Sequence, residues 1–409
     1  MSKSLSSIWL KNLRRLGKSQ QTQGRKLLKS LIPALTKPAK PRRTPALRSA
    51  KAARPVRALK ATAPKKRIGT GGIAAPRAAK SLQKKSAAAA SPAAGLPGSW
   101  KKAWFLQAAT ALSPARRMLY WLYLPSGSAK APRPLVVMLH GCQQTATDFA
   151  ASSRMNRLAE RKGFAVLYPQ QSVTADSHRC WHWYKRATQQ GLGDARLLAE
   201  MIGQLQSRHQ LDATRTYAAG ISAGAGMAAI LALRHPELIA AVGLHSAPVF
   251  GTSDSALSGF KVMQQGSLLA YRESARQFAA AQPGFPGMPV MLIQGRRDAV
   301  VRRVNVDQLA EQFLILNGEQ ISSTAPVLRS YPARTGGRSP RHGYETISYY
   351  AGRKPRVVKC EIEALGHAWS GGEASQAFSA PEGPDSTLLM WTFFALQQRL
   401  PKKPKATQN

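Results

Sequence analysis

A serine lies between two glycines at residues 220–224, in the sequence GISAG. The residues before it, 215–219, predict a short buried strand, and residues 225–233 after it predict a helix of small and apolar residues. A sharp turn from strand to helix needs glycine-sized neighbours, and it presents the serine hydroxyl above the positive end of the helix. The pattern therefore favours Ser222 as a nucleophile over its alternative, an ordinary turn.

Two further residues can activate such a serine. Asp298 follows the apolar run at residues 289–293, and His367 follows the run at residues 356–362. A neutral imidazole removes the proton of the serine, and a carboxylate fixes the tautomer of the imidazole and stabilises its charged form. A turn carboxylate and a loop histidine are the simpler alternatives, and Asp307 is a rival acid. The chain order of serine, acid and histidine is that of the α/β-hydrolases.

The residues after an earlier apolar run can stabilise negative charge. Residues 134–139 predict a central strand that is buried on both faces, and Gly141 lets the chain turn closely over the site. We expect the backbone amides of Cys142 and Ala223 to form an oxyanion hole, in which each donor is typically worth about 3 kcal/mol of barrier. We interpret His140 as a residue that holds this loop by hydrogen bonds.

The remaining pattern sets the fold class. Residues 164–169 and 240–245 predict further parallel strands, and helices such as residues 197–202 lie between them. This alternation predicts a doubly wound, mostly parallel sheet with helices on both faces. Asp212 and Arg215 flank the turn into the strand before Ser222, and we expect them to pin it.

Four separated motifs carry a family resemblance. They are HGCQQ at residues 140–144, CWHWY at 180–184, GISAGAGM at 220–227 and GHAWSGG at 366–372. Together they resemble the polyhydroxybutyrate depolymerase type esterases, a family of the α/β-hydrolase superfamily, from about residue 117 to about residue 400. The resemblance implies a serine esterase with Ser222, Asp298 and His367 as its catalytic triad and Cys142 and Ala223 as backbone oxyanion donors. Members of the family cleave short-chain polyhydroxyalkanoate esters, and relatives act on acetyl or feruloyl groups of polysaccharides.

Residues near these motifs are candidates for substrate binding. We predict this role for Gln143 and for three tryptophans, for which core packing is the alternative to a wall for an apolar acyl chain: Trp181, Trp183 and Trp369. The sequence shows no metal-ligand spacing and no glycine-rich phosphate loop with its lysine, so we expect neither a metal nor another cofactor.

Composition divides the chain. Residues 1–100 hold 24 of the 60 lysines and arginines and no acidic residue, and the first acid is Asp148. The whole chain has a formal net charge of +41. We predict a basic amphipathic helical segment at residues 1–35, a disordered linker rich in Lys, Arg, Ala and Pro at residues 36–100, a hydrolase domain at residues 101–400 and a basic tail at residues 401–409.

The first segment suggests a partner. Apolar residues at a helical spacing alternate with basic ones and include Leu5, Ile8, Trp9, Leu13 and Leu16. This pattern favours binding to an anionic granule or membrane surface. Packing on the hydrolase and attraction to nucleic acid are the alternatives, and nucleic acid is the weaker of the two.

Location is predicted less directly. Lys11, Arg14 and Arg15 interrupt the early apolar residues, so no signal peptide is evident, although the family is commonly extracellular. A cytoplasmic or granule-associated protein is therefore favoured. The chain has three cysteines, too few for a secreted disulfide framework. A disulfide between Cys142 and Cys180 near the site is one alternative, and two free buried thiols are the expectation if the protein is cytoplasmic.

The sequence thus predicts a serine esterase for short hydroxyacyl esters, with poly(3-hydroxybutyrate) or its oligomers as the substrate. Its alternatives are an acetyl or feruloyl polysaccharide esterase and a non-catalytic surface-binding protein on a hydrolase fold.

Overall fold

The computed structural model describes residues 91–109, 114–128, 131–268, 270–318, 321, 325–336 and 340–400. Within these residues, ten strands form one sheet in the order β1-β2-β4-β3-β5-β6-β7-β10-β9-β8. The strands are β1 (Ser99–Gln107), β2 (Arg116–Leu124), β3 (Arg133–Leu139), β4 (Ala165–Gln170), β5 (Leu211–Ile221), β6 (Ala241–His245), β7 (Val290–Gly295), β8 (Val327–Tyr331), β9 (Tyr344–Ala351) and β10 (Lys354–Ile362). A separate pair consists of β11 (Trp369–Ser370) and β12 (Ser379–Ala380).

The centre of the large sheet is parallel. Strands β4, β3, β5, β6, β7 and β10 pair in parallel. Strands β1 and β2 at one edge, and β9 and β8 at the other, pair antiparallel. The predicted doubly wound, mostly parallel sheet is confirmed.

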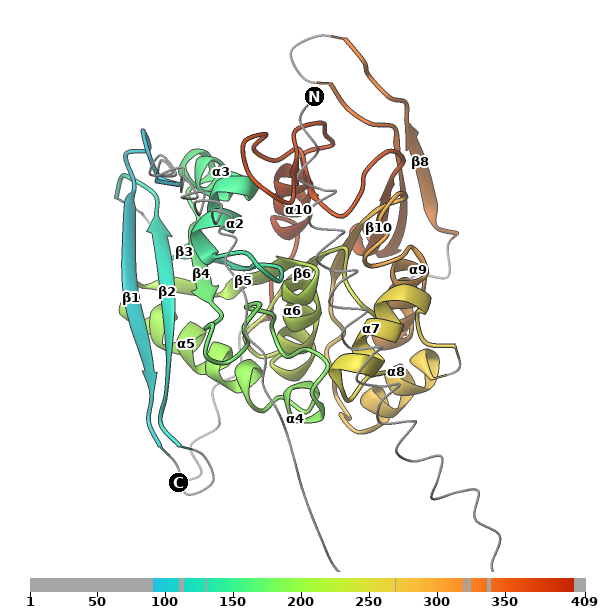
Figure 1. Cartoon of the computed structure of the whole chain (residues 1–409), viewed down its shortest axis with the longest axis horizontal. Coiled ribbons are helices and arrows are strands. Elements are labelled where there is room, and N and C mark those ends of the chain that lie inside the picture. Colours follow the sequence, from blue (N-terminus) through green and yellow to red (C-terminus); the bar gives the residue numbers. More distant parts are fainter. Residues whose placement is uncertain are drawn as a thin grey trace, which may run out of the picture. The chain divides into compact units, whose positions relative to one another are not determined.

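Helices cover both faces of this sheet (Figure 1). Apolar residues of α5 (Asp194–Arg208), α6 (Ala223–Arg234), α7 (Ala256–Gln265), α8 (Tyr271–Ala280) and α9 (Val304–Asn317) pack in the core on one face. Apolar residues of α2 (Ala146–Ser153), α3 (Met155–Lys162) and α10 (Ser386–Phe394) pack on the other. The short α4 (Arg186–Gln189) contacts α5 and α6.

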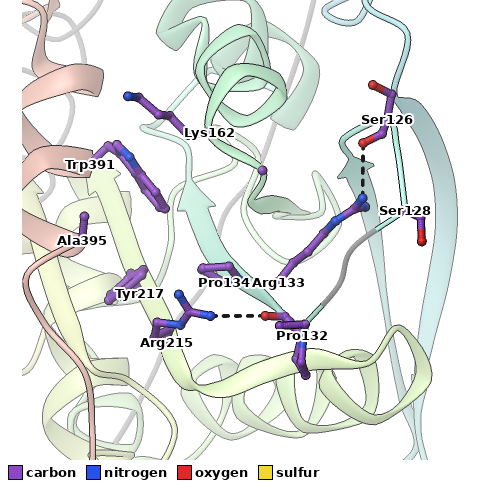
Figure 2. A pocket seen from close by; sticks show the side chains of 12 residues that line it. Ser126, Ser128, Pro132, Arg133, Pro134, Lys162, Arg215, Tyr217, Trp391 and Ala395 are labelled. Atoms are coloured by element: carbon purple, nitrogen blue, oxygen red, sulfur yellow. Dashed lines mark hydrogen bonds between the residues drawn. The ribbon is translucent and has the colours of Figure 1, made fainter.

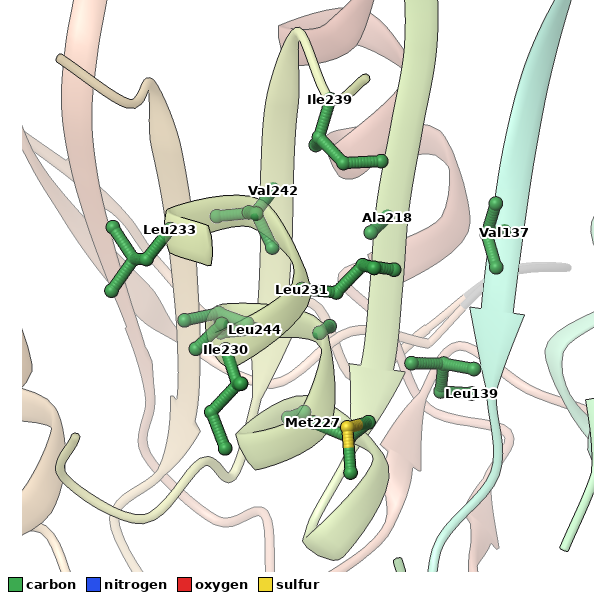
Figure 3. Packing of buried hydrophobic residues seen from close by; sticks show 14 of the residues in the cluster. Val137, Leu139, Ala218, Met227, Ile230, Leu231, Leu233, Ile239, Val242 and Leu244 are labelled. Carbon is green, nitrogen blue, oxygen red and sulfur yellow. The ribbon is translucent and has the colours of Figure 1, made fainter. Parts of the chain in front are cut away.

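Alternation along β3 explains the two cores. Leu135, Val137 and Leu139 face the core that contains α6, whereas Val136 and Met138 face the core that contains α2. All five side chains are fully buried, and full burial stabilises by about 1.5–3 kcal/mol for a side chain of this size. Figure 3 shows the first core, where α6 packs its apolar side chains against the strands beside β5.

The strand register brings the predicted motifs together. Leu139 of β3 pairs with Gly220 of β5, and Gly220 pairs with Leu244 of β6. Ile362 of β10 pairs with Gly295 of β7. Parallel strands that end at the same level place their following loops at one edge of the sheet, where ligands bind in open α/β sheets. The loops that carry Cys142, Ser222, Asp298 and His367 therefore meet there.

The described residues begin inside the predicted linker and not at the predicted start of the hydrolase domain. Ala93 and Leu96 pack against the core, and β1 begins at Ser99, inside the predicted linker. The predicted helical segment at residues 1–35, most of the linker and the tail at residues 401–409 lie outside the described residues. None of the described helices is both long enough and apolar enough to cross a membrane.

Candidate active site

Ser222 stands at the turn between β5 and α6. Its backbone has φ 58° and ψ −125°, a conformation that residues with a side chain seldom adopt. Its amide donates to the carbonyl oxygen of His245 at 3.0 Å, which ties the turn to β6. A Cβ atom on Gly220 would lie 2.5 Å from the carbonyl carbon of Gly224, and one on Gly224 would lie 2.0 Å from the carbonyl oxygen of Leu139. The two glycines therefore permit the crowded turn that holds Ser222.

Asp298 and His367 form a buried pair. The Nδ1 of His367 lies 2.7 Å from Oδ2 of Asp298, and both side chains are almost entirely buried. The other carboxylate oxygen, Oδ1, accepts hydrogen bonds from the amides of Val300 and Val301 at 2.9 Å each. Burial alone raises the pKa of Asp298, but the facing imidazole and these hydrogen bonds outweigh it and hold the pKa below its usual value. The carboxylate is thus ionised where it orients the imidazole.

Backbone bonds join the loops that carry this pair. The amide of Arg296 donates to the carbonyl oxygen of Ile362 at 2.8 Å, and the amide of Arg297 donates to that of Leu365 at 2.9 Å. Residues 295–298 and 362–367 therefore form one unit, and the acid and the histidine are placed together.

The predicted oxyanion donors come from two different elements. Ala223 is the first residue of α6, and Cys142 lies in the loop after β3. The amide of an N-terminal helical residue has no partner within its helix, and it points along the positive end of the helix dipole. Cys142 borders the same cavity as Ser222 and His367. The described geometry is thus compatible with the predicted oxyanion hole.

His140 holds the loop after β3. Its Nδ1 donates to the carbonyl oxygen of Gly141 at 2.8 Å, and its Nε2 accepts from the amide of Gln171 at 3.1 Å. The side chain is completely buried, and burial lowers the pKa of His140 to about 4. The imidazole is therefore neutral and structural, in agreement with the sequence interpretation.

A segment at residues 178–181 braces the same loop. A disulfide joins Cys142 to Cys180, with a Cα–Cα distance of 4.3 Å. The amide of Gln143 donates to the carbonyl oxygen of His178 at 2.6 Å, and Nε1 of Trp181 donates to that of His140 at 3.1 Å. Of the two alternatives that the sequence left open for Cys142 and Cys180, the structure has the disulfide. The spacing of the two cysteines did not reveal that the chain returns to the oxyanion loop.

Asp194 holds the segment at residues 178–181 in place through its neighbours. The buried carboxylate accepts hydrogen bonds from Arg116 at 2.7 Å and from Nε2 of Gln171 at 2.8 Å, and it lies 3.3 Å from Nδ1 of His182. Burial raises its pKa, but the bonds from His182 and Arg116 prevail and lower the pKa to about 2. The ionised Asp194 therefore links α5 to both sides of the segment that contains Cys180.

The cavity beside the nucleophile is narrow. Its volume is about 10 Å³, which is roughly the room that one water molecule needs. Seven residues line it: Gly141, Cys142, Gln144, Ile221, Ser222, His367 and Phe378. Sequence reasoning missed Gln144 because it selected the adjacent Gln143 of the same motif, and it missed Phe378 because no recognised motif contains that residue.

The residues predicted to bind substrate lie elsewhere. Gln143 is half-buried and does not line the cavity. Trp181 and Trp369 are 0% exposed and Trp183 is 5% exposed, and all three pack in the core. The correction is physical, because a side chain enclosed by protein atoms has no surface left for an acyl chain. The structure thus favours the core alternative for the tryptophans.

His245 packs near His367 and Asp298. Its ring stacks on Trp369, with ring centres 5.2 Å apart, and it is fully buried. Burial, followed by the nearby His367, lowers the pKa of His245 to about 3. His245 therefore adds no positive charge beside His367 at neutral pH.

A larger cavity lies away from this site (Figure 2). It has a volume of about 400 Å³ and is bordered by Lys162 at the end of α3, Trp391 of α10 and the first residues of β3. Two arginines in its wall bind main-chain carbonyls: Arg133 donates to Ser126, and Arg215 donates to Pro132. It opens near the amino ends of β3 and β5, whereas Ser222 follows the carboxyl end of β5. This cavity is therefore not placed to hold an ester at Ser222.

Comparison with known proteins identifies the family. The family model for esterase PHB depolymerases matches residues 118–331. This chain belongs to that family. The matched residues include Ser222, Asp298, Cys142 and Ala223, whereas His367 lies beyond them.

The individual relatives are named either as depolymerases or as acetylxylan esterases. The chain is 30% identical over 249 residues to the poly(3-hydroxyalkanoate) depolymerase C of Paucimonas lemoignei, covering 60% of this chain and 57% of that protein. It is also 30% identical over 237 residues to a probable acetylxylan esterase A of Aspergillus fumigatus, covering 56% of this chain and 61% of that protein. The chain thus spans less than two thirds of the length of each of these two relatives.

Among solved structures, the acetyl xylan esterase from Aspergillus awamori matches 72% of this chain and 99% of its own, with 20% identity and a TM-score of 0.54. At this identity the likeness shows the α/β-hydrolase fold. In the part of the chain that the structure describes, no group of three or more His, Cys, Asp or Glu side chains is arranged to hold a metal ion.

Proposed function

We propose that this chain is a serine esterase that hydrolyses short-chain hydroxyacyl esters, with poly(3-hydroxybutyrate) or its oligomers as its substrate. The hydrogen bond between Asp298 and His367 at the cavity of Ser222 is the observation that carries the proposal. An ionised acid, an imidazole held by its Nδ1 and a serine in a strained turn are the parts that acyl transfer needs.

The reaction follows from these parts. Nε2 of His367 takes the proton of Ser222 while Oγ attacks the ester carbonyl carbon and forms a tetrahedral intermediate. The amides of Cys142 and Ala223 stabilise its oxyanion. His367 then gives the proton to the leaving alcohol oxygen as the carbon–oxygen bond breaks, which leaves an acyl group on Ser222. Water attacks this acyl-enzyme in the same manner, releases the acid and restores the serine.

The choice of acyl group rests on the family and on the relatives. The family and one matched relative are named for polyhydroxyalkanoate esters. Another relative is named for acetylxylan, which supports an acetyl polysaccharide esterase as the second candidate. A feruloyl esterase has no such support among these relatives.

The first test separates an esterase from a non-catalytic protein. A fluorophosphonate probe should label the full chain at Ser222 and should not label the Ser222→Ala variant. Absence of labelling in the unchanged protein, together with absence of turnover on every ester, would refute catalysis. Hydroxybutyrate oligomers, acetylated xylan and p-nitrophenyl esters should then be compared by kcat/KM, and a higher value on acetylated xylan would favour the second candidate.

We further propose that residues 1–35 bring the enzyme to an anionic granule or membrane surface. The proposal rests on the basic, acid-free sequence with Ile8, Trp9 and Leu13 at a helical spacing. Each Lys or Arg near such a surface contributes about 1 kcal/mol. Deleting residues 1–90 should leave the rate on a soluble ester within about threefold, which is under 1 kcal/mol of barrier. Sedimentation with anionic vesicles should fall sharply, and salt should weaken it in the full chain. If truncation instead lowers both Tm and the soluble rate, the segment packs on the hydrolase.

A further inference from the structure

Gln144 is a buried polar residue that lines the cavity beside Ser222. The residue follows the oxyanion loop after β3, and its side chain is only 3% exposed. It borders the cavity together with Ser222 and His367. A buried polar side chain in this position needs partners for both ends of its amide.

One end of the amide has a partner. Oε1 of Gln144 accepts a hydrogen bond from the amide of Gly141 at 2.8 Å. Because a backbone N–H is a donor only, this bond fixes which end of the side-chain amide is the oxygen. The NH₂ group must therefore occupy the other position.

The NH₂ group has no partner. Nε2 of Gln144 is buried and makes no hydrogen bond to any residue that the structure describes. Other described side-chain amides with an unpaired buried atom are Asn156, Gln294 and Asn317, but none of them lines the cavity beside Ser222. A buried donor without an acceptor is costly, and at a binding site a ligand atom supplies the acceptor.

We infer that Gln144 determines acyl selectivity by donating a hydrogen bond from Nε2 to an oxygen that the acyl group carries. The inference rests on the proposed serine esterase and specifies its substrate class. A 3-hydroxyacyl group bears such an oxygen two carbons from the reacting carbonyl, as a hydroxyl in the monomer or as an ester oxygen in the polymer. An acetyl or alkanoyl group bears none and leaves the donor unpaired.

The alternative role for Nε2 of Gln144 is that of a third oxyanion donor, since a tetrahedral oxyanion has three lone pairs and the amides of Cys142 and Ala223 are expected to use two. Such a donor acts on every ester alike and leaves the ratio between two esters unchanged. Gln144 instead contributes to the choice between acyl groups, and through Gly141 its Oε1 holds the loop that carries Cys142.

A pair of matched esters tests this role. Methyl 3-hydroxybutanoate and methyl 3-methylbutanoate differ by a hydroxyl in place of a methyl group, and proton release measures the hydrolysis of each. For the full chain we expect kcat/KM to favour the hydroxy ester by about 10-fold or more, because the other ester leaves a buried donor unpaired. Gln144→Met removes the donor and should bring the ratio to within about threefold, mainly by loss on the hydroxy ester.

A second variant separates selectivity from loop support. Gln144→Glu keeps an oxygen to accept from Gly141 but replaces the NH₂ donor with an acceptor. A hydroxyl can still donate to this acceptor, so the variant is tested with methyl 3-methoxybutanoate, whose ether oxygen can only accept, and its preference over methyl 3-methylbutanoate should collapse. Gln308→Met is the matched control, since Gln308 is a buried glutamine of α9 whose amide bonds Ser267 at 2.8 and 2.9 Å. It should lower Tm and leave the ratio unchanged.

The outcomes are distinct. If both Gln144 variants lower the rates on all these esters equally and keep the ratios, Gln144 only supports the loop or the oxyanion and the inference is overturned. An unchanged protein that hydrolyses both esters equally well also overturns it. In both cases the esterase proposal survives, because turnover persists. Absence of both turnover and fluorophosphonate labelling in the unchanged protein would overturn the esterase proposal and this inference together.

Discussion

Replacing Asp298 with asparagine tests the proposed triad without changing its shape. Oδ1 of Asp298 accepts from two backbone amides, those of Val300 and Val301. In Asp298→Asn the amide oxygen must keep this position, because the NH₂ group has no lone pair to offer. The NH₂ group then faces Nδ1 of His367, which must become the acceptor. The proton of the neutral imidazole moves to Nε2, and the ring loses the lone pair that takes the proton of Ser222.

The size of the effect follows from this tautomer. An imidazole held in the wrong tautomer lowers kcat by about 10⁴, which corresponds to about 5.5 kcal/mol of barrier. We therefore expect a loss of this order for Asp298→Asn on a soluble p-nitrophenyl ester, with the fold retained. Circular dichroism and thermal unfolding of the same preparation would check that the loss is catalytic.

Asp307→Asn is the matched control. Asp307 lies on α9, is partly exposed and accepts from Nζ of Lys359 at 2.7 Å, so it does not contact His367 in the structure. We expect kcat within about threefold of the unchanged protein, because surface ion pairs contribute little. A mild Asp298→Asn together with a damaging Asp307→Asn would show that the acid has been assigned wrongly.

Three further predictions concern Ser222, the disulfide and the buried Asp194. Ser222→Ala and His367→Ala should each lower kcat by about 10⁴ or more. The double variant should be scarcely slower than either single variant, because the two residues act as one unit. A kcat of the double variant that is lowered by the product of the two single losses would contradict this. Cys180→Ser opens a loop with a sequence separation of 38 and should lower the free energy of unfolding by about 4 kcal/mol in urea, whereas equal stability with and without a reductant would show that the bond to Cys142 does not form in solution. The pKa of Asp194 is lowered to about 2, so its contribution is present above the unfolded value of 3.8 and is lost as pH falls toward 2. Asp194→Asn should thus cost about 2 kcal/mol near pH 7 and almost nothing near pH 2, and urea unfolding that gives the same difference at both pH values would contradict the assignment.

The sequence predicted the parallel sheet and the loops that meet at its edge, for a physical reason. Strands buried on both faces, such as β3 and β7, are continuous apolar runs that need no knowledge of their partners to be recognised. Once such strands are parallel, their carboxyl ends share one edge. The residues just past those ends, including Asp298 and His367, must then lie close together.

The sequence did not predict the long-range contacts that bury the tryptophans. Tryptophans that flank a motif have the same composition whether they face a cavity or the core. Trp369 is in the core because its Nε1 finds Thr387 of α10, and Trp181 because its Nε1 finds the carbonyl oxygen of His140. Each partner is distant along the chain, so neither periodicity nor spacing contains the information.

The disulfide is a similar case. Its formation depends on where the segment after β4 returns, which the local sequence does not encode. The bond between Cys142 and Cys180 lies directly on the predicted oxyanion loop.

Gln144 lines the cavity where the sequence predicted Gln143, and this difference has a local cause. Gln143 has φ 66°, in the left-handed region, and such a residue reverses the direction of the chain within one step. The reversal leaves the Gln143 side chain half-buried away from the cavity and turns Gln144 inward, where its oxygen returns to the amide of Gly141. Two adjacent residues of the same type are equivalent in a motif and become distinct only through the backbone angle between them. The residue proposed to set selectivity therefore cannot be predicted from the sequence of this loop. Ser222 can be predicted, because its turn requires the glycines on either side of it.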